Sequence, residues 1–382
     1  MECRRCFTML AKFGLAAALL FGANPMTALS GGRNHDTSKT FKRTLTLHGP
    51  NESGDSDDYV ASLAFVGPNG VLVSSYRDAS VRIWRLAGGG TFNEVKPHSP
   101  DCWGGVHVAG SRNEQVFAAM SSDDDSALWV WNANDNLLTA RLRGFSVYPQ
   151  ALAFLSTGAL VTVGGPVRER DGEVRLDVGE IRIWDLSDGT SRLLDPGKHA
   201  LSTIAISPDG KSAVTGDYEG EMTVWNLATG DAVQILKADL WVDSLAYSSD
   251  GKLIASAGER IRIWQPPQSE PIHVLERHYG DQRGVTVAFQ PGSAVVASTD
   301  FDTVLLWDAL TGKLVDGFRV AGEQVASLAF SADGKKLAVG CYNGTIEIWE
   351  TIEVQRPRAS APCRNWNPRR IIKRHCSKSR RH

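Results

Sequence analysis

The sequence predicts an all-β protein: a ring of seven four-stranded antiparallel sheets, which is a seven-bladed β-propeller closed by an N-terminal strand in the last blade. Three observations predict it. A tryptophan closes a β-rich run seven times, a Gly-containing turn recurs in five of the repeats, and the 382 residues include 37 glycines and 11 tryptophans. Short strands, tight turns and one bulky residue reused at intervals are typical of such rings.

The repeat is marked by tryptophans that end runs such as SVRIW, EIRIW and TIEIW. The intervals between successive tryptophans are 47, 53, 41, 39, 43 and 42 residues, and each is the length of one blade. The residues that we assign this structural role are Trp84, Trp131, Trp184, Trp225, Trp264, Trp307 and Trp349.

The order of elements inside each unit predicts its four strands. An apolar strand over 203–206 runs into Ser207-Pro208-Asp209-Gly210, and a second strand leaves this turn. Proline fixes φ, aspartate bonds its own backbone and glycine takes positive φ, so the segment is a hairpin. The tryptophan strand follows a polar turn, and a fourth, more polar strand comes after it. Each unit is therefore a four-stranded antiparallel sheet.

These features together resemble WD40 repeats over roughly residues 41–354. The S-P-D-G turn, the small residues that end the second strand, and Trp184-Asp185 and Trp307-Asp308 carry the resemblance. The other five units depart from the W-D pair. A His of this family joins a Ser or Thr, an Asp and the Trp in a structural hydrogen-bond set. Only His48, His199 and His278 lie near its expected place, so packing should matter more here.

The chain ends predict how the ring closes. Too few residues follow Trp349 to complete a blade, whereas residues 41–47, FKRTLTL, alternate as a strand does. We expect this segment to be the outermost strand of blade seven, because an open ring would expose two large apolar faces.

The first thirty residues have the pattern of a signal peptide. Arg4, Arg5 and Lys12 precede an apolar run over 13–23, and Ala28-Leu29-Ser30 offers a cleavage site. We expect export to the periplasm or exterior, followed by a linker over 31–40. The alternatives are an uncleaved membrane anchor and a disordered start in a cytoplasmic protein. Cleavage leaves four cysteines, whose three possible pairings stay open.

The net charge of −2 hides a strong asymmetry. The segment 355–382 carries ten Lys or Arg and no acid, while residues 51–354 carry 24 basic and 41 acidic residues. The tail is predicted to be disordered, and nucleic acid, an anionic surface or the acidic ring itself could bind it. No transmembrane span is expected after processing.

No catalytic constellation is visible in the sequence. The nine histidines lack metal-ligand spacing, and neither a G-x-S-x-G elbow nor a phosphate loop is present. We therefore expect no catalytic residue, no cofactor-binding residue, no cofactor and no metal. The alternative is a propeller enzyme, such as a lactonase or hydrolase, with its site in the central channel.

Charged loops are the candidate partner-binding sites. One acidic group precedes blade one, and others join the second and third strands of blades two and four, on a single face of the expected ring. An acidic rim attracts basic partners. The longest departure from the repeat, 166–178, adds a charged insertion in blade three. The candidates are Asp55, Asp57, Asp58, Asp123, Asp124, Asp125, Arg168, Glu169, Arg170, Asp217 and Glu219.

Solvated turns that only keep the protein soluble would have the same composition, so this second interpretation of the acidic loops stays open. The resemblance implies a non-catalytic scaffold that holds proteins or peptides on loops of one face, and the acidic rim favours basic ones. Seven rigid sheets would hold those loops in fixed relative positions, so ordering them on binding costs little.

Overall fold

The computed structural model describes residues 40–49, 59–68, 70–96, 106–121, 127–145, 148–165, 167–168, 174–175, 179–194, 199–238, 240–276, 285–321 and 324–352. It contains seven four-stranded antiparallel sheets arranged as a propeller, so the predicted fold class is confirmed. All the strands belong to one compact unit. Among the described residues no helix is long and apolar enough to cross a membrane.

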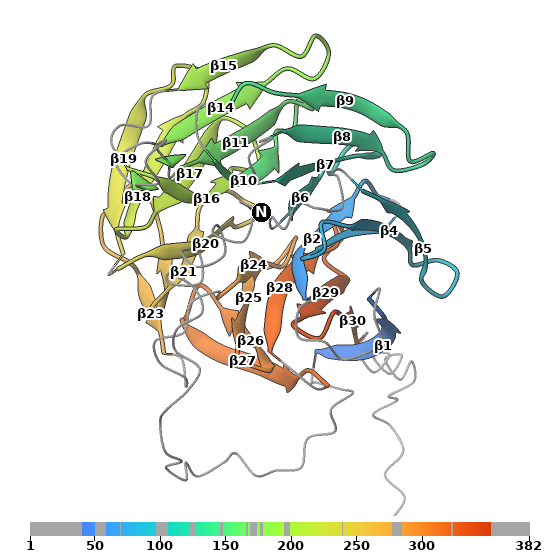
Figure 1. Cartoon of the computed structure of the whole chain (residues 1–382). Helices are drawn as coiled ribbons and strands as arrows, with labels where there is room; N and C mark the ends of the chain where they lie inside the picture. Colours follow the sequence, from blue (N-terminus) through green and yellow to red (C-terminus); the bar gives the residue numbers. More distant parts are fainter. Residues whose placement is uncertain are drawn as a thin grey trace, which may run out of the picture. The chain divides into compact units, whose positions relative to one another are not determined.

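Each blade runs from an innermost first strand to an outermost fourth strand (Figure 1). Blade one is β2 (Val60–Val66), β3 (Val71–Tyr76), β4 (Val81–Arg85) and β5 (Thr91–Val95). Blade two is β6 (Val106–Gly110), β7 (Val116–Ser121), β8 (Leu128–Asn132) and β9 (Leu138–Leu142). Blade three is β10 (Pro149–Phe154), β11 (Leu160–Gly164), β14 (Glu180–Trp184) and β15 (Ser191–Leu194).

Blade four is β16 (Leu201–Ile206), β17 (Ser212–Asp217), β18 (Glu221–Asn226) and β19 (Ala232–Lys237). Blade five is β20 (Val242–Tyr247), β21 (Ile254–Gly258), β22 (Ile261–Trp264) and β23 (His273–Leu275). Blade six is β24 (Val287–Phe289), β25 (Val295–Asp300), β26 (Thr303–Asp308) and β27 (Lys313–Arg319). Blade seven is β28 (Val325–Phe330), β29 (Lys336–Cys341), β30 (Ile346–Thr351) and β1 (Phe41–Leu47).

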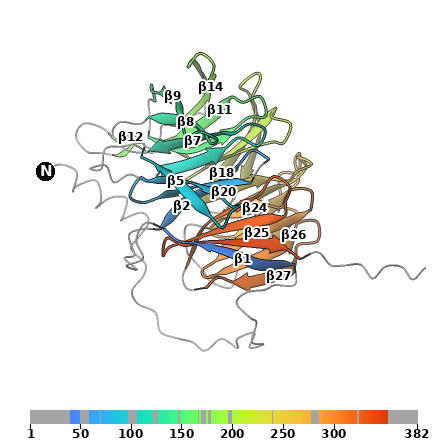
Figure 2. The same ribbon diagram turned by 90° about the vertical axis from the view of Figure 1, so that its right-hand side faces the viewer.

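The closure by the N-terminal strand is confirmed, because β1 pairs antiparallel with β30 from Phe41↔Thr351 to Leu47↔Ile346. Phe41 is buried among Phe318, Phe330 and Trp349. In Figures 1 and 2, β1 lies at the outer rim beside β27, where Thr40 donates a backbone N–H to Asp316 at 2.9 Å. The first and last strands of the ring thus complete one sheet.

The seven tryptophans are all buried, as the repeat predicts. In five blades the indole Nε1 donates to a Ser or Thr hydroxyl on the second strand, for example from Trp225 to Thr215 at 2.9 Å. The other four pairs are Trp84–Ser74, Trp184–Thr162, Trp264–Ser256 and Trp307–Ser298.

Blades two and seven depart from this pattern. Ala119 in blade two pairs with Trp129, at the place of the hydroxyl residue, and Trp131 stacks on Phe117 at 5.3 Å between ring centroids. In blade seven the same place is Val339, and Trp349 donates instead to Glu347 at 3.0 Å. Packing and a carboxylate therefore replace the missing hydroxyls.

Candidate protein-interaction face

The strand order gives the ring two faces. We call the "loop face" the side that holds the connections between blades and those between second and third strands. The "turn face" holds the turns between first and second strands and between third and fourth strands. Because consecutive strands are antiparallel, every first strand starts at the loop face and ends at the turn face.

Two of the predicted charged residues are described with their side chains, and both lie in blade four. Asp217 ends β17, and its side chain is not an exposed loop group, since the residue is only 2% exposed. Its Oδ1 accepts the backbone N–H groups of Glu219 at 2.9 Å and Glu221 at 2.7 Å. Burial raises the pKa of Asp217, while these two bonds oppose the rise. Asp217 therefore organises the turn that presents Glu219.

Glu219 is the exposed member of the pair. Its side chain is 71% exposed, and its Oε2 lies 3.5 Å from Nδ1 of His199, which precedes the first strand of the same blade. Next to it, Tyr218 donates its hydroxyl to Gln150 on β10 at 3.3 Å. This loop therefore joins blade four to blade three and leaves a carboxylate facing solvent.

The other predicted partner-binding side chains lie outside the described part of the structure. They are Asp55, Asp57 and Asp58 between β1 and β2, Asp123, Asp124 and Asp125 between β7 and β8, and Glu169 and Arg170 in the blade-three insertion. The insertion contains a short ladder in which β12 (Val167–Arg168) pairs with β13 (Val174–Arg175). Arg168 is described only through this backbone pairing. The predicted signal peptide and the predicted disordered tail are also outside the described residues.

An aromatic group near the channel on the loop face was missed by the sequence analysis. We call Tyr59, Trp241, Asp243 and Tyr342 the "aromatic rim". Tyr59 and Tyr342 stack with their ring centroids 5.2 Å apart, and Trp241 donates to Asp243 at 3.2 Å. Burial, followed by the nearby Tyr59 and Asp243, raises the pKa of Tyr342. The rim thus consists of a stacked pair from blades one and seven and a hydrogen-bonded pair from blade five.

Neighbouring loops add apolar surface to this face. Leu240 is 52% exposed before β20, and Phe301 is 46% exposed between β25 and β26.

On the inner strand β6, burial lowers the pKa of His107. Within the described residues, no group of three His, Cys, Asp or Glu side chains is placed to hold a metal ion. Rings, apolar side chains and carboxylates are the contacts available here, and these suit a polypeptide surface.

Comparisons with known proteins agree with the repeat. Residues 41–85, 230–265 and 312–350 match the family model described as WD domain, G-beta repeat. Each matched segment ends one residue beyond a blade tryptophan: Trp84, Trp264 and Trp349.

Several curated proteins are similar to part of the chain. The periodic tryptophan protein 2 homolog of Dictyostelium discoideum is 23% identical over 226 residues, which cover 46% of this chain and 24% of that protein. The guanine nucleotide-binding protein subunit beta of Oryza sativa subsp. japonica is 23% identical over 262 residues, covering 61% and 65%. WD repeat-containing protein 70 of Xenopus laevis is 26% identical over 197 residues, covering 44% and 31%. The chain thus spans less than two thirds of each relative.

Proposed function

We propose that this chain, a seven-bladed propeller that carries WD40 repeats, is a non-catalytic scaffold that holds basic protein or peptide partners on its loop face. The observation that carries the proposal is the aromatic rim, which offers two stacked tyrosine rings from blades one and seven and the hydrogen-bonded Trp241–Asp243 pair of blade five. Aromatic side chains at the centre of a surface, with charges around them, are the usual anchors of protein interfaces.

The predicted charge of the partner follows from the acidic groups on this face. Glu219 is exposed, Asp243 lies in the rim, and the chain places further aspartates in the connections that enter blade one and join the strands of blade two. Complementary charge mainly speeds association, and this effect weakens as the salt concentration rises. Arginine or lysine side chains stacked on the rim rings would add cation–π attraction.

A charge-matched comparison of the two faces tests the proposal. Binding of a lysine-rich decapeptide is measured at low and high salt for the protein, for Glu219→Gln with Asp243→Asn, and for Glu114→Gln with Asp231→Asn, two exposed residues of the turn face. We expect the loop-face variant to weaken binding severalfold at low salt and the turn-face variant to have little effect. Equal binding by all three proteins would refute the loop-face assignment.

We also propose that the protein is exported and cleaved after Ser30. The position of β1 supports this, because the strand that closes the ring begins at Phe41, so cleavage removes none of it. Amino-terminal sequencing of the protein from its native host should read Gly31-Gly32-Arg33. A mature chain that still begins at Met1 would refute the proposal.

A further inference from the structure

Seven equivalent residues surround the central channel on the turn face. We call them the "turn ring". In every blade one backbone N–H donates across the turn between the first and second strands, and the turn-ring residue is the next residue in the chain. In blade four that N–H belongs to Ser207 and bonds to Ser212, and blade two has the same bond from Ser111 to Val116. The turn ring consists of Gly67, Arg112, Ser156, Pro208, Ser249, Pro291 and Ala332.

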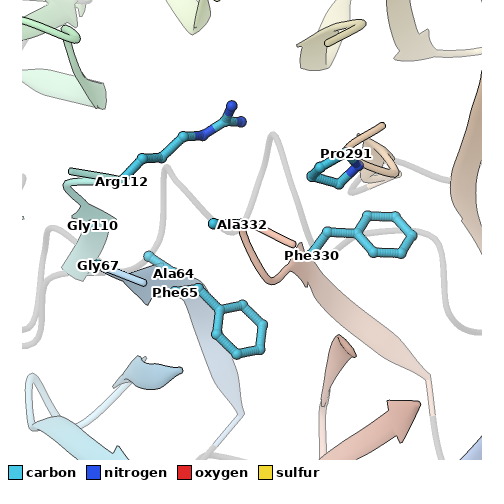
Figure 3. Close-up of a pocket in the computed structure, with 8 residues that line it drawn as sticks. All are labelled: Ala64, Phe65, Gly67, Gly110, Arg112, Pro291, Phe330 and Ala332. Carbon is cyan, nitrogen blue, oxygen red and sulfur yellow. The ribbon is translucent and has the colours of Figure 1, made fainter. Parts of the chain in front are cut away.

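Arg112 is the only charged residue of the turn ring, since the other six are glycine, serine, proline or alanine. The small residues leave room, and a cavity of about 150 Å³ lies against four members of the ring: Gly67, Arg112, Pro291 and Ala332. Phe65 and Phe330 add apolar wall. Figure 3 shows the Arg112 side chain reaching from blade two into the space that faces Ala332 and Pro291.

The Arg112 guanidinium has no carboxylate partner among the described residues. The aspartates of two other turns are held within those turns: Asp209 in blade four accepts from Ser207 at 2.6 Å, and Asp333 in blade seven accepts from Ser331 at 2.6 Å. Crowding by the surrounding protein lowers the pKa of Arg112, although the residue remains exposed to solvent. A crowded cation without a counter-charge favours binding of an anion.

We propose that Arg112 binds a carboxylate in this cavity, so that the turn face holds a second site with a charge preference opposite to that of the loop face. The planar guanidinium donates two parallel N–H groups, which match the two oxygens of a carboxylate. A cavity of this volume accepts a group about the size of benzene. The ligand is therefore a carboxylate on a short apolar stem, from a small free acid or from an acidic side chain or carboxyl terminus of a polypeptide.

The proposal is tested by NMR titration of the intact protein. Backbone amide signals of the cavity residues Gly67, Gly110 and Ala332 are followed in every variant, and the Nε–Hε signal is followed as well wherever Arg112 is present. The probes are propionate, the peptide acetyl-Gly-Gly-Glu-Gly-Gly-amide, its Gln counterpart, and pentaglycine with a free or amidated carboxyl end. The variants are Arg112→Gln, Arg112→Lys and the control Lys211→Gln, which removes one positive charge from an exposed position in the blade-four turn.

We expect saturable binding of at least one carboxylate probe, weakened at least tenfold by Arg112→Gln and less than twofold by Lys211→Gln. Arg112→Lys should retain part of the affinity. Binding of propionate alone assigns the site to free acids, whereas binding of the Glu peptide or of pentaglycine with its free end extends it to polypeptides. The proposal would be overturned if no carboxylate probe binds, or if Arg112→Gln binds the probes as tightly as the natural protein does. Neither result would bear on the proposed binding of basic partners at the loop face.

Discussion

Arg43 on β1 donates to Glu347 on β30, with 2.9 Å between Nη1 and Oε1. The Glu347 side chain is only 2% exposed, and it also accepts the Ala321 backbone N–H at 3.1 Å and the Trp349 indole at 3.0 Å. One buried carboxylate thus satisfies three donors from β1, from β30 itself and from the connection that enters blade seven.

Removal of this carboxylate should destabilise the protein strongly. Glu347→Ala leaves the Trp349 indole and the Ala321 N–H without their acceptor, and we expect a loss of roughly 3 kcal/mol in the free energy of unfolding. Glu350→Ala is the control, because Glu350 lies on the same strand, β30, and the variant breaks only its more exposed ion pair with Lys336 on β29; it should cost at most about 1 kcal/mol. Denaturant unfolding measures both; equal losses would contradict the prediction.

The closing strand should stabilise the whole ring rather than its own end. Phe41 is 1% exposed and packs against Phe318 at 6.5 Å and Phe330 at 6.2 Å between ring centroids. We expect Phe41→Ala to cost about 3–5 kcal/mol and to shift a single cooperative transition. The adjacent, exposed Lys42→Ala should change stability by less than about 0.5 kcal/mol. A separate early transition in the Phe41 variant would show that β1 only frays locally.

The indole hydrogen bonds predict unequal effects of one substitution in two blades. Trp225→Phe loses ring volume and also the bond to Thr215, which is buried. Trp131→Phe loses the same ring volume but no bond to a hydroxyl, because Ala119 occupies the position that Thr215 has in blade four. Trp225→Phe should therefore cost about 1 kcal/mol more than Trp131→Phe. A thermal or urea unfolding series on the two variants measures this difference, and a smaller loss for Trp225→Phe would be inconsistent with it.

Three repeated turns should weaken in acid. The hydrogen bond from Ser207 lowers the pKa of Asp209, and Ser248 and Ser331 do the same for Asp250 and Asp333. A lowered folded-state pKa stabilises the fold above the unfolded pKa of about 3.9, and the gain is lost as pH falls through the folded value. The variant that replaces Asp209, Asp250 and Asp333 by alanine should melt a few degrees below the natural protein at pH 7. This difference in melting temperature should narrow below about pH 4. A pH-independent gap would exclude this mechanism.

Asp217 should show the opposite dependence on pH. Burial raises its pKa, so stability is lost as pH rises through the folded-state value and the carboxylate becomes charged. Asp217→Asn keeps an oxygen for the Glu219 and Glu221 amides, and its stability relative to the natural protein should rise from pH 3 to pH 7. Asp217→Ala loses both bonds and should cost about 1–3 kcal/mol. Melting curves of both variants across this pH range measure these effects. A stability of Asp217→Asn relative to the natural protein that stays constant or falls from pH 3 to pH 7 would contradict the prediction.

The sequence by itself determined the number of blades, the four strands of each and the role of residues 41–47, because strand alternation and turn residues act locally and repeat at a fixed interval. Only the tertiary structure decided which side chains meet. Arg43 and Glu347 lie 304 positions apart, and Arg112 joins Pro291 and Ala332 at one cavity only after the ring has closed. The burial of Asp217 was hidden for a related reason: a polar residue at a strand end looks like a solvated loop residue until its neighbours in space cover it.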